Sequence, residues 1–183
     1  EPLIKAGVLG FKVFLTHSGI DEFPNISLKE LEKSLPLLAR YGLPLLVHAE
    51  LDKKHPGQKE LEADNYSYSA WLNSRPKSWE DEAVKAMIAL CKKHKVRTHI
   101  VHLSSSASLD MIRAAKAAGL PLTVETCPHY LHFTKDAACG DLAKVNPPVR
   151  VKKDQDAMWQ GILDGVVDTI GSDHVARKRE TKM

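Results

Sequence analysis

The chain has 183 residues, a formal net charge of +3 and 43% hydrophobic residues. This composition is typical of a globular domain and excludes a disordered chain. Basic and acidic residues are interspersed, so a nucleic-acid partner is not expected. No apolar run approaches the roughly 18 residues of a membrane span, so a membrane is not expected either. The odd cysteine count, without metal-ribbon spacing, favours reduced thiols and a cytoplasmic location (Cys91, Cys127 and Cys139).

Short apolar runs alternate along the chain with segments of helical periodicity. The apolar runs predict strands over residues 10–16, 43–48, 96–102, 120–125 and 166–172. The periodic segments predict helices over residues 27–41, 66–74, 78–94, 106–118 and 153–163. Strands and helices in strict alternation, joined by short connections, indicate an α/β fold built on a parallel sheet.

Several helix boundaries have clear sequence signals. Ser27 followed by Glu30 has the pattern of a capping box, and Gly42 is a natural stop for the same helix. Ser78 is expected to cap the helix over residues 78–94. Gly119 is expected to end the helix over residues 106–118.

The kind of parallel sheet follows from what the turns lack. No strand is followed by a glycine-rich nucleotide fingerprint, which favours part of a (β/α)8 barrel over a doubly wound sheet. A full barrel takes about 250 residues, and five strands cannot close into eight. We therefore expect residues 1–183 to be the C-terminal part of a barrel domain, strands four to eight, with three strands upstream.

Four of the predicted strands carry a polar residue at or near the carboxyl end, namely Lys12, His48, His102 and Asp173. In a barrel these ends share one rim, where active sites lie, and imidazole with carboxylate suits zinc, manganese or iron. Each residue also has a structural interpretation: His48 can be a satisfied core histidine and Asp173 a cap. His99, three residues before His102, is expected to face the opposite way on the strand.

Five segments together resemble the cyclic amidohydrolases, which include allantoinases, hydantoinases, dihydropyrimidinases and dihydroorotases: LLVHAE, HIVHLSS, ETCPHYL, NPPVR and GSDH. They occur in the order found in that family and span almost the whole chain. Residues 18–24, 75–80 and 125–131 look like the allantoinase branch, whereas NPPVR is shared more widely.

The resemblance implies roles for the strand-end residues. Lys12 would be carbamylated and bridge two divalent metal ions, zinc being the expected metal. His48 and His102 would bind one ion, and Asp173 would bind the other and act as general base and then acid. The second ion of such enzymes also takes two histidines from an HxH motif, which this sequence does not contain.

Two further residues are candidate substrate contacts by the same resemblance. His17 stands where hydantoinases have a tyrosine that helps to hold the oxyanion, and it is equally consistent with an exposed loop residue. Asn146 matches a segment whose backbone contacts the substrate, and it is at least as consistent with a turn before the two prolines that follow it.

The function implied is metal-dependent opening of a small cyclic amide, with allantoin converted to allantoate in purine catabolism as the favoured reaction. Hydantoin, dihydropyrimidine or dihydroorotate hydrolysis is the alternative, and a noncatalytic homologue that assembles with partners is the alternative of another class. The resemblance also implies a homo-oligomer, commonly a tetramer. Because three strands and the HxH pair are missing, the isolated chain is expected to be poorly folded and inactive.

Overall fold

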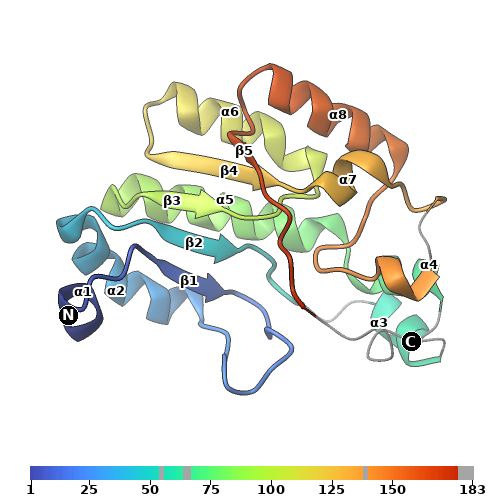
Figure 1. Cartoon of the computed structure of the whole chain (residues 1–183), viewed down its shortest axis with the longest axis horizontal. Helices are drawn as coiled ribbons and strands as arrows, with labels where there is room; N and C mark the ends of the chain where they lie inside the picture. Colours follow the sequence, from blue (N-terminus) through green and yellow to red (C-terminus); the bar gives the residue numbers. More distant parts are fainter. Residues whose placement is uncertain (54–55, 64–66, 138–139, 177–183) are drawn as a thin grey trace.

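The computed structural model describes residues 1–53, 56–63, 67–137 and 140–176. Its centre is a five-stranded sheet in the order β1-β2-β3-β4-β5, with every neighbouring pair parallel (Figure 1). The strands are β1 (Phe11–Phe14), β2 (Leu45–His48), β3 (Thr98–Ile100), β4 (Leu122–Thr126) and β5 (Thr169–Ile170). The predicted α/β fold with a parallel sheet is confirmed, and each observed strand is shorter than its apolar run.

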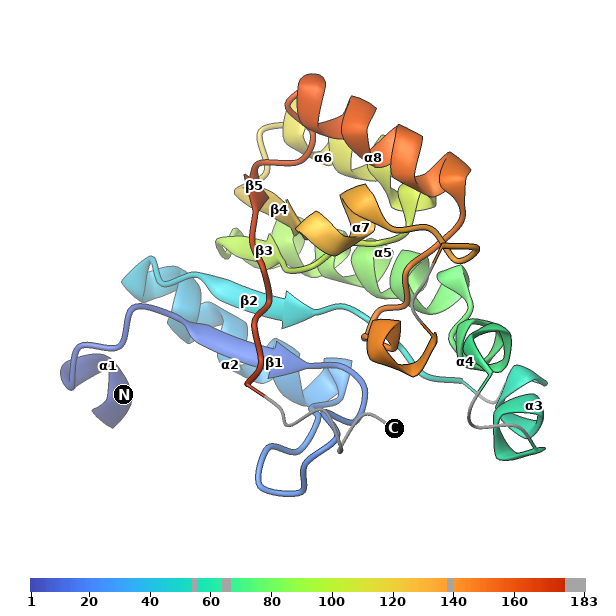
Figure 2. The ribbon, with the colours of Figure 1, turned by 45° about the vertical axis from the view of Figure 1, so that its right-hand side comes forward.

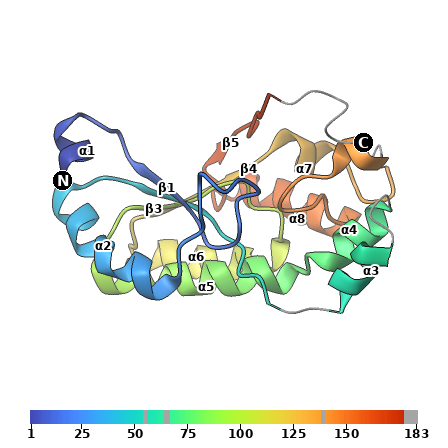
Figure 3. The ribbon, with the colours of Figure 1, turned by 90° about the horizontal axis from the view of Figure 1, so that it is seen from below.

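The helices are α1 (Pro2–Lys5), α2 (Leu28–Tyr41), α3 (Gly57–Ala63), α4 (Tyr68–Ser74), α5 (Lys77–His94), α6 (Leu109–Ala117), α7 (Pro128–His132) and α8 (Lys152–Leu163), with 3-10 turns η1 (Ser106–Ser108) and η2 (Gly140–Ala143). The long helices α2, α5 and α6 lie together on one side of the sheet (Figure 3). The short helices α3, α4 and α7 lie beyond the carboxyl ends of the strands (Figure 1).

The predicted helix ends are confirmed for α2 and corrected for α5. The Ser27 hydroxyl accepts from the Glu30 amide at 3.2 Å, and Gly42 ends α2 with a φ of +64°. Helix α5 begins at Lys77, so the cap expected at Ser78 is wrong. Pro76 holds the capping position instead, in extended backbone, and its fixed φ starts the helix one residue earlier.

The strand register separates the residues of the sheet into two faces. Val47 pairs with Ile100, which pairs with Val124, and all three are at most 1% exposed beneath the helices. The alternate row runs through Lys12, Leu46, His99 and Thr123 on the opposite face. Helices therefore cover one face and leave the other open, as the alternation of side chains along each strand requires.

Other expectations are met only in part. Among the described residues, no helix is both long and apolar enough to cross a membrane. Cys91 and Cys127 are free buried thiols, whereas Cys139 lies outside the described residues. Tyr66, the expected first residue of α4, also lies outside them. The short helices α3 and α7 were not predicted, although Pro128 at the first position of α7 is a recognised start signal.

Candidate metal centre

Strand β1, the carboxyl end of β2 and the loop after β3 bring a lysine and two histidines together on the open face. Lys12 is the second of the four residues of β1, so its expected place near the carboxyl end of the strand is wrong. The Lys12 amine lies 4.5 Å from the centre of the Phe14 ring. That ring stacks on His48 with centroids 4.8 Å apart, and the His48 ring meets His102 edge-on at 4.6 Å. The structure thus joins three of the four expected ligand residues in one continuous row of contacts.

Asp173 reaches the same region from the other edge of the sheet. The segment after β5 runs across the open face toward β1 (Figure 1 and Figure 2). Burial lowers the pKa of the Lys12 amine, and the negative charges of Asp173 and Glu125 oppose that shift. Asp173 is itself exposed, so its charge acts on Lys12 from the solvent side of the site.

Two of these residues have an unusual backbone conformation. His102 has a φ of +42° and Asp173 a φ of +46°. Of the described residues other than glycine, only Lys95 shares a positive φ, and it ends a helix. Left-handed backbone costs about 1–3 kcal/mol at such residues and is concentrated at functional sites. The positive φ values are therefore evidence, independent of the ring contacts, that His102 and Asp173 belong to a functional site.

The expected opposition of His99 and His102 is wrong. The alternation rule applies only within a strand, and β3 ends at Ile100. His102 lies beyond that end, where its positive φ turns the side chain back onto His48. His99 lies in the same cross-strand row as Lys12, and the charge of Lys12 acts on both histidines. Both therefore lie on the open face.

Glu125 on β4 is a charged residue of this face to which the sequence analysis gave no role. Its carboxylate lies 4.0 Å from the His99 ring and contributes to the electrostatics of Lys12. A side chain at Gly171 would meet the Glu125 carboxylate at 2.4 Å. Glycine there lets the β5 segment pass close to Glu125. The family-like motifs around both residues were the only available sequence signal.

A buried carboxylate holds the far side of the His48 ring. The Glu50 Oε2 atom lies 2.8 Å from His48 Nε2 and accepts from Arg75 Nη1 at 2.9 Å. Burial raises the pKa of Glu50, but the hydrogen bond from His48 and the charge of Arg75 outweigh it, so that pKa lies below its usual value. Glu50 is therefore an ionised acceptor in the interior.

A second buried ion pair supports the loop after β3. Arg150 Nη2 donates to Glu80 Oε2 at 2.9 Å, and the same carboxylate accepts from the Ser104 amide at 2.9 Å and its hydroxyl at 2.6 Å. Arg150 also donates to the Arg75 carbonyl at 2.6 Å. The NPPVR segment thus connects the loop that carries His102 to the arginine that holds Glu50.

The donor chemistry of the row suits a transition metal. His102 Nδ1 is buried without a hydrogen-bond partner among the described residues. Burial lowers the pKa of His102 well below 6.5, with smaller contributions from His48 and Lys12, so the ring is neutral and can act as a ligand. Within the described residues no three His, Cys, Asp or Glu side chains form a metal site by themselves. The two imidazoles therefore need Lys12 or further ligands.

The two candidate substrate residues lie in different surroundings. The His17 side chain is 60% exposed, accepts from the Gly19 amide at 3.1 Å and lies 3.6 Å from Asp21. Asn146 is half-buried before Pro147, and its Oδ1 atom has no hydrogen-bond partner among the described residues. No contact joins either residue to the row of Lys12, His48 and His102 in the described part of the chain, so both roles stay predictions.

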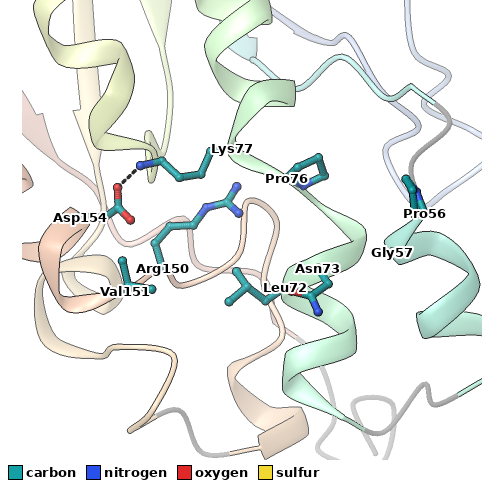
Figure 4. A pocket seen from close by; sticks show the side chains of 9 residues that line it. All are labelled: Pro56, Gly57, Leu72, Asn73, Pro76, Lys77, Arg150, Val151 and Asp154. Atoms are coloured by element: carbon teal, nitrogen blue, oxygen red, sulfur yellow. Dashed lines mark hydrogen bonds and ion pairs between the residues drawn. The ribbon is translucent and has the colours of Figure 1, made fainter.

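A cavity of about 360 Å³ lies apart from this row. It is lined by residues of α4, the start of α5 and the segment that leads into α8, and none of its described lining residues belongs to the candidate metal centre. Figure 4 shows Arg150 reaching toward Pro76 beside the Lys77–Asp154 ion pair. Arg150, which pairs with Glu80, therefore also forms part of the wall of this cavity.

Solved structures place the fold among cyclic amidohydrolases. The chain is similar to the L-hydantoinase (dihydropyrimidinase) of Arthrobacter aurescens with a TM-score of 0.85 and 29% identity, over 94% of this chain and 39% of that one. It is similar to a D-hydantoinase of a Thermus species with a TM-score of 0.85 and 26% identity, over 98% of this chain and 40% of that one. No model of a protein family matches the chain.

Sequence relatives narrow the resemblance to allantoinases. The chain is 43% identical to the mitochondrial allantoinase of Aquarana catesbeiana over 94% of its length, 42% to that of Streptomyces avermitilis over 95%, and 39% to that of Arabidopsis thaliana over 100%. It spans 36%, 39% and 38% of those relatives' own lengths. The resemblance to allantoinases is confirmed over nearly the whole chain, which corresponds to slightly more than a third of such a protein.

Proposed function

We propose that this chain forms strands four to eight of a (β/α)8 amidohydrolase barrel and supplies one half of a two-metal site that opens the ring of allantoin to give allantoate. The observation that carries the proposal is the convergence of Lys12, His48, His102 and Asp173 on the open face, from β1, the end of β2 and the segments after β3 and β5. Helices on only one face support the barrel, since a doubly wound sheet is covered on both.

The residues of this half-site divide the chemistry among them. His48 and His102 would hold one divalent ion, zinc being favoured by the imidazole donors. Lys12 is half-buried with a lowered pKa, which leaves more free amine to attack carbon dioxide. The carbamate forms when the amine nitrogen bonds the carbon and loses a proton to solvent. The product would be an anion whose two oxygens could each bind a divalent ion.

Asp173 would carry the proton during ring opening. When bound, the metal pair lowers the pKa of water and polarises the ring carbonyl. The Asp173 carboxylate, exposed beside Lys12, accepts the proton of the attacking water and returns it to the leaving ring nitrogen. His17 and Asn146 are proposed to contact the substrate.

The choice of allantoin rests on sequence. Allantoinases match this chain at 35–43% identity, whereas the structurally similar hydantoinases match at 26–31%. A cytoplasmic location and a homo-tetramer are parts of the same proposal, the first supported by the buried free thiols and the second by the resemblance alone.

A chimera tests the proposal. This chain replaces the matched segment of the Streptomyces avermitilis allantoinase, with which it is 42% identical over 176 residues. We expect the chimera to bind zinc and convert allantoin to allantoate, while the isolated chain is inactive. Turnover of hydantoin, dihydrouracil and dihydroorotate is measured in parallel, and light scattering gives the oligomeric state.

The outcomes separate the alternatives. Faster turnover of dihydrouracil or hydantoin than of allantoin would replace the substrate and keep the reaction class. A folded chimera that binds no zinc and hydrolyses none of the four compounds would contradict the enzyme proposal and favour a noncatalytic assembly role.

A further inference from the structure

We propose that Glu50, anchored by Arg75, is a positioning residue that fixes the His48 ring in the tautomer that leaves the lone pair of Nδ1 free for a metal ion. This inference rests on the proposed function only in that the free nitrogen is meant for a metal ion. The hydrogen bonds on which the inference is based are formed within this chain.

The tautomer follows from what each atom can do. His48 Nε2 and Glu50 Oε2 are 2.8 Å apart, and the two side chains are 5% and 0% exposed. An ionised carboxylate only accepts hydrogen bonds, so the proton must sit on Nε2. The neutral ring then has its lone pair on Nδ1. The rings of Phe14 and His102 contact the same imidazole at 4.8 and 4.6 Å and limit its rotation.

Arg75 holds the carboxylate in the orientation that this bond needs. Its guanidinium donates to the same Oε2 atom at 2.9 Å, whereas Glu50 Oε1 is buried without a hydrogen-bond partner among the described residues. Arg75 is held in turn by the faces of Trp71 and Trp79, at 5.3 and 5.9 Å from the ring centres. The anchor is therefore concentrated on one oxygen, and the other oxygen does not compete for the ring.

The chain contains a matched pair that lacks this support. On the surface His94 Nε2 lies 3.0 Å from Glu32 Oε1, which also accepts from Lys93 at 2.7 Å. The Glu32 side chain is 35% exposed, against 0% for Glu50. Both pairs join an imidazole to a carboxylate, but only the buried pair is next to the candidate ligands. Substitution at Glu32 therefore controls for the general effect of removing a carboxylate from a histidine.

The experiment measures the His48 ring and zinc binding at one pH in the purified chimera described above, in which the chain stands in a complete barrel. Two-bond proton–nitrogen spectra of 15N-histidine-labelled protein report which ring nitrogen carries the proton, and chelator competition gives the zinc affinity. We expect the unaltered chain to show His48 with the proton on Nε2. Glu50→Leu should lose this preference and weaken zinc binding by about 10–100-fold, as loss of such outer partners does.

Glu50→Gln keeps an accepting oxygen, so it should restore the tautomer and most of the zinc affinity, which a merely structural role would not explain. Glu32→Gln should change neither measurement. If the Glu50→Leu chain does not fold, Arg75→Met replaces it, and we expect a mixture of His48 tautomers with weaker zinc binding.

Retention of the Nε2 proton and of the original zinc affinity in Glu50→Leu, or in Arg75→Met where that variant replaces it, would overturn the inference. The two proposals fail in different ways. A chain that binds no zinc yet shows the expected tautomer and its loss would contradict the proposed half-site alone. A chain that binds zinc equally well with and without Glu50 would contradict the positioning role alone.

Discussion

On the helix-covered face of the sheet, Val47, Ile100 and Val124 are at most 1% exposed and have purely apolar side chains. On the open face, the same strands and the loops that follow them present Lys12, His48 and His102. Burial of the apolar side chains on the first face stabilises the fold. The second face holds an amine and an imidazole with lowered pKa values, and a second imidazole whose ring is confined by its neighbours. The difference teaches that one face specifies the fold and the other the chemistry, and substitutions should separate the two.

The largest expected effect is on the open side. Asp173→Asn in the chimera keeps the shape of the side chain but removes its ability to take up a proton. Because general acid–base groups contribute about 10²- to 10⁴-fold, we expect the rate of allantoin hydrolysis to fall by that factor. The control is Asp164→Asn, a carboxylate that pairs with Arg113 after α8 and should leave the rate unchanged. Equal activity in both variants would remove Asp173 from the mechanism.

A substitution on the helix-covered face should give the converse result. Ile100→Ala leaves a cavity under the helices, since Ile100 is 1% exposed, and should lower the free energy of unfolding by about 2–5 kcal/mol. Thr123→Ala, at an exposed position in the open-face row of β4, should change it by less than about 0.5 kcal/mol. Urea denaturation of the chimera measures both. Similar losses in the two variants would contradict the division between the faces.

Lys12 tests the claim that the open face gives up stability for chemistry. Lys12→Met keeps the apolar stem and removes the half-buried amine, whose pKa burial lowers. We expect zinc binding to weaken while the free energy of unfolding rises by about 0.5–2 kcal/mol, the usual gain when a site residue is made apolar. Lys135→Met, at a lysine that pairs with Asp136 on the surface, is the control. A destabilised Lys12→Met chain would show that the amine supports the fold.

The sequence predicted the fold better than the site because the two depend on different signals. Apolar runs and helical periodicity located all the described strands and the long helices, since nearly all of these elements bury their own apolar residues. Strand β5 is the exception: it was located by the buried Val166 and Val167 that precede it. The ends were less accurate: the apolar run over residues 96–102 continues past β3, where His102 takes a positive φ that no periodicity encodes.

The supporting residues of the site could not be found in the same way. Glu50 and Arg75 are 25 residues apart, and Arg150 meets Glu80 across 70 residues. Nothing in the local sequence says that these charges share an interior, because their pairing arises only when α4, α5 and the NPPVR segment pack together. The motifs HAE and NPPVR marked the positions without giving the contacts.

The smallest expected effect concerns the dependence of stability on pH. Burial lowers the pKa of His102 in the folded chain well below 6.5, the value expected when the chain unfolds. The unfolded state therefore binds a proton that the folded state refuses, and the free energy of unfolding falls as the pH drops below about 6.5. Above about pH 6.5 the residue is neutral in the unfolded chain as well, so His102 no longer makes the free energy of unfolding depend on pH. The His102→Asn chain should show a shallower loss of stability over this acid range.

The matched control is His132→Gln at the exposed end of α7, which replaces a histidine outside the row of Lys12, His48 and His102 and should leave the acid slope unchanged. Urea denaturation of the metal-free chimera at several pH values between about 5 and 7 gives the slopes, which link stability to proton uptake. An identical slope in the original chain and in His102→Asn would mean that His102 takes up its proton equally easily when folded. The open face would then differ from the helix-covered face in its residues, but folding would not change how easily His102 takes up a proton.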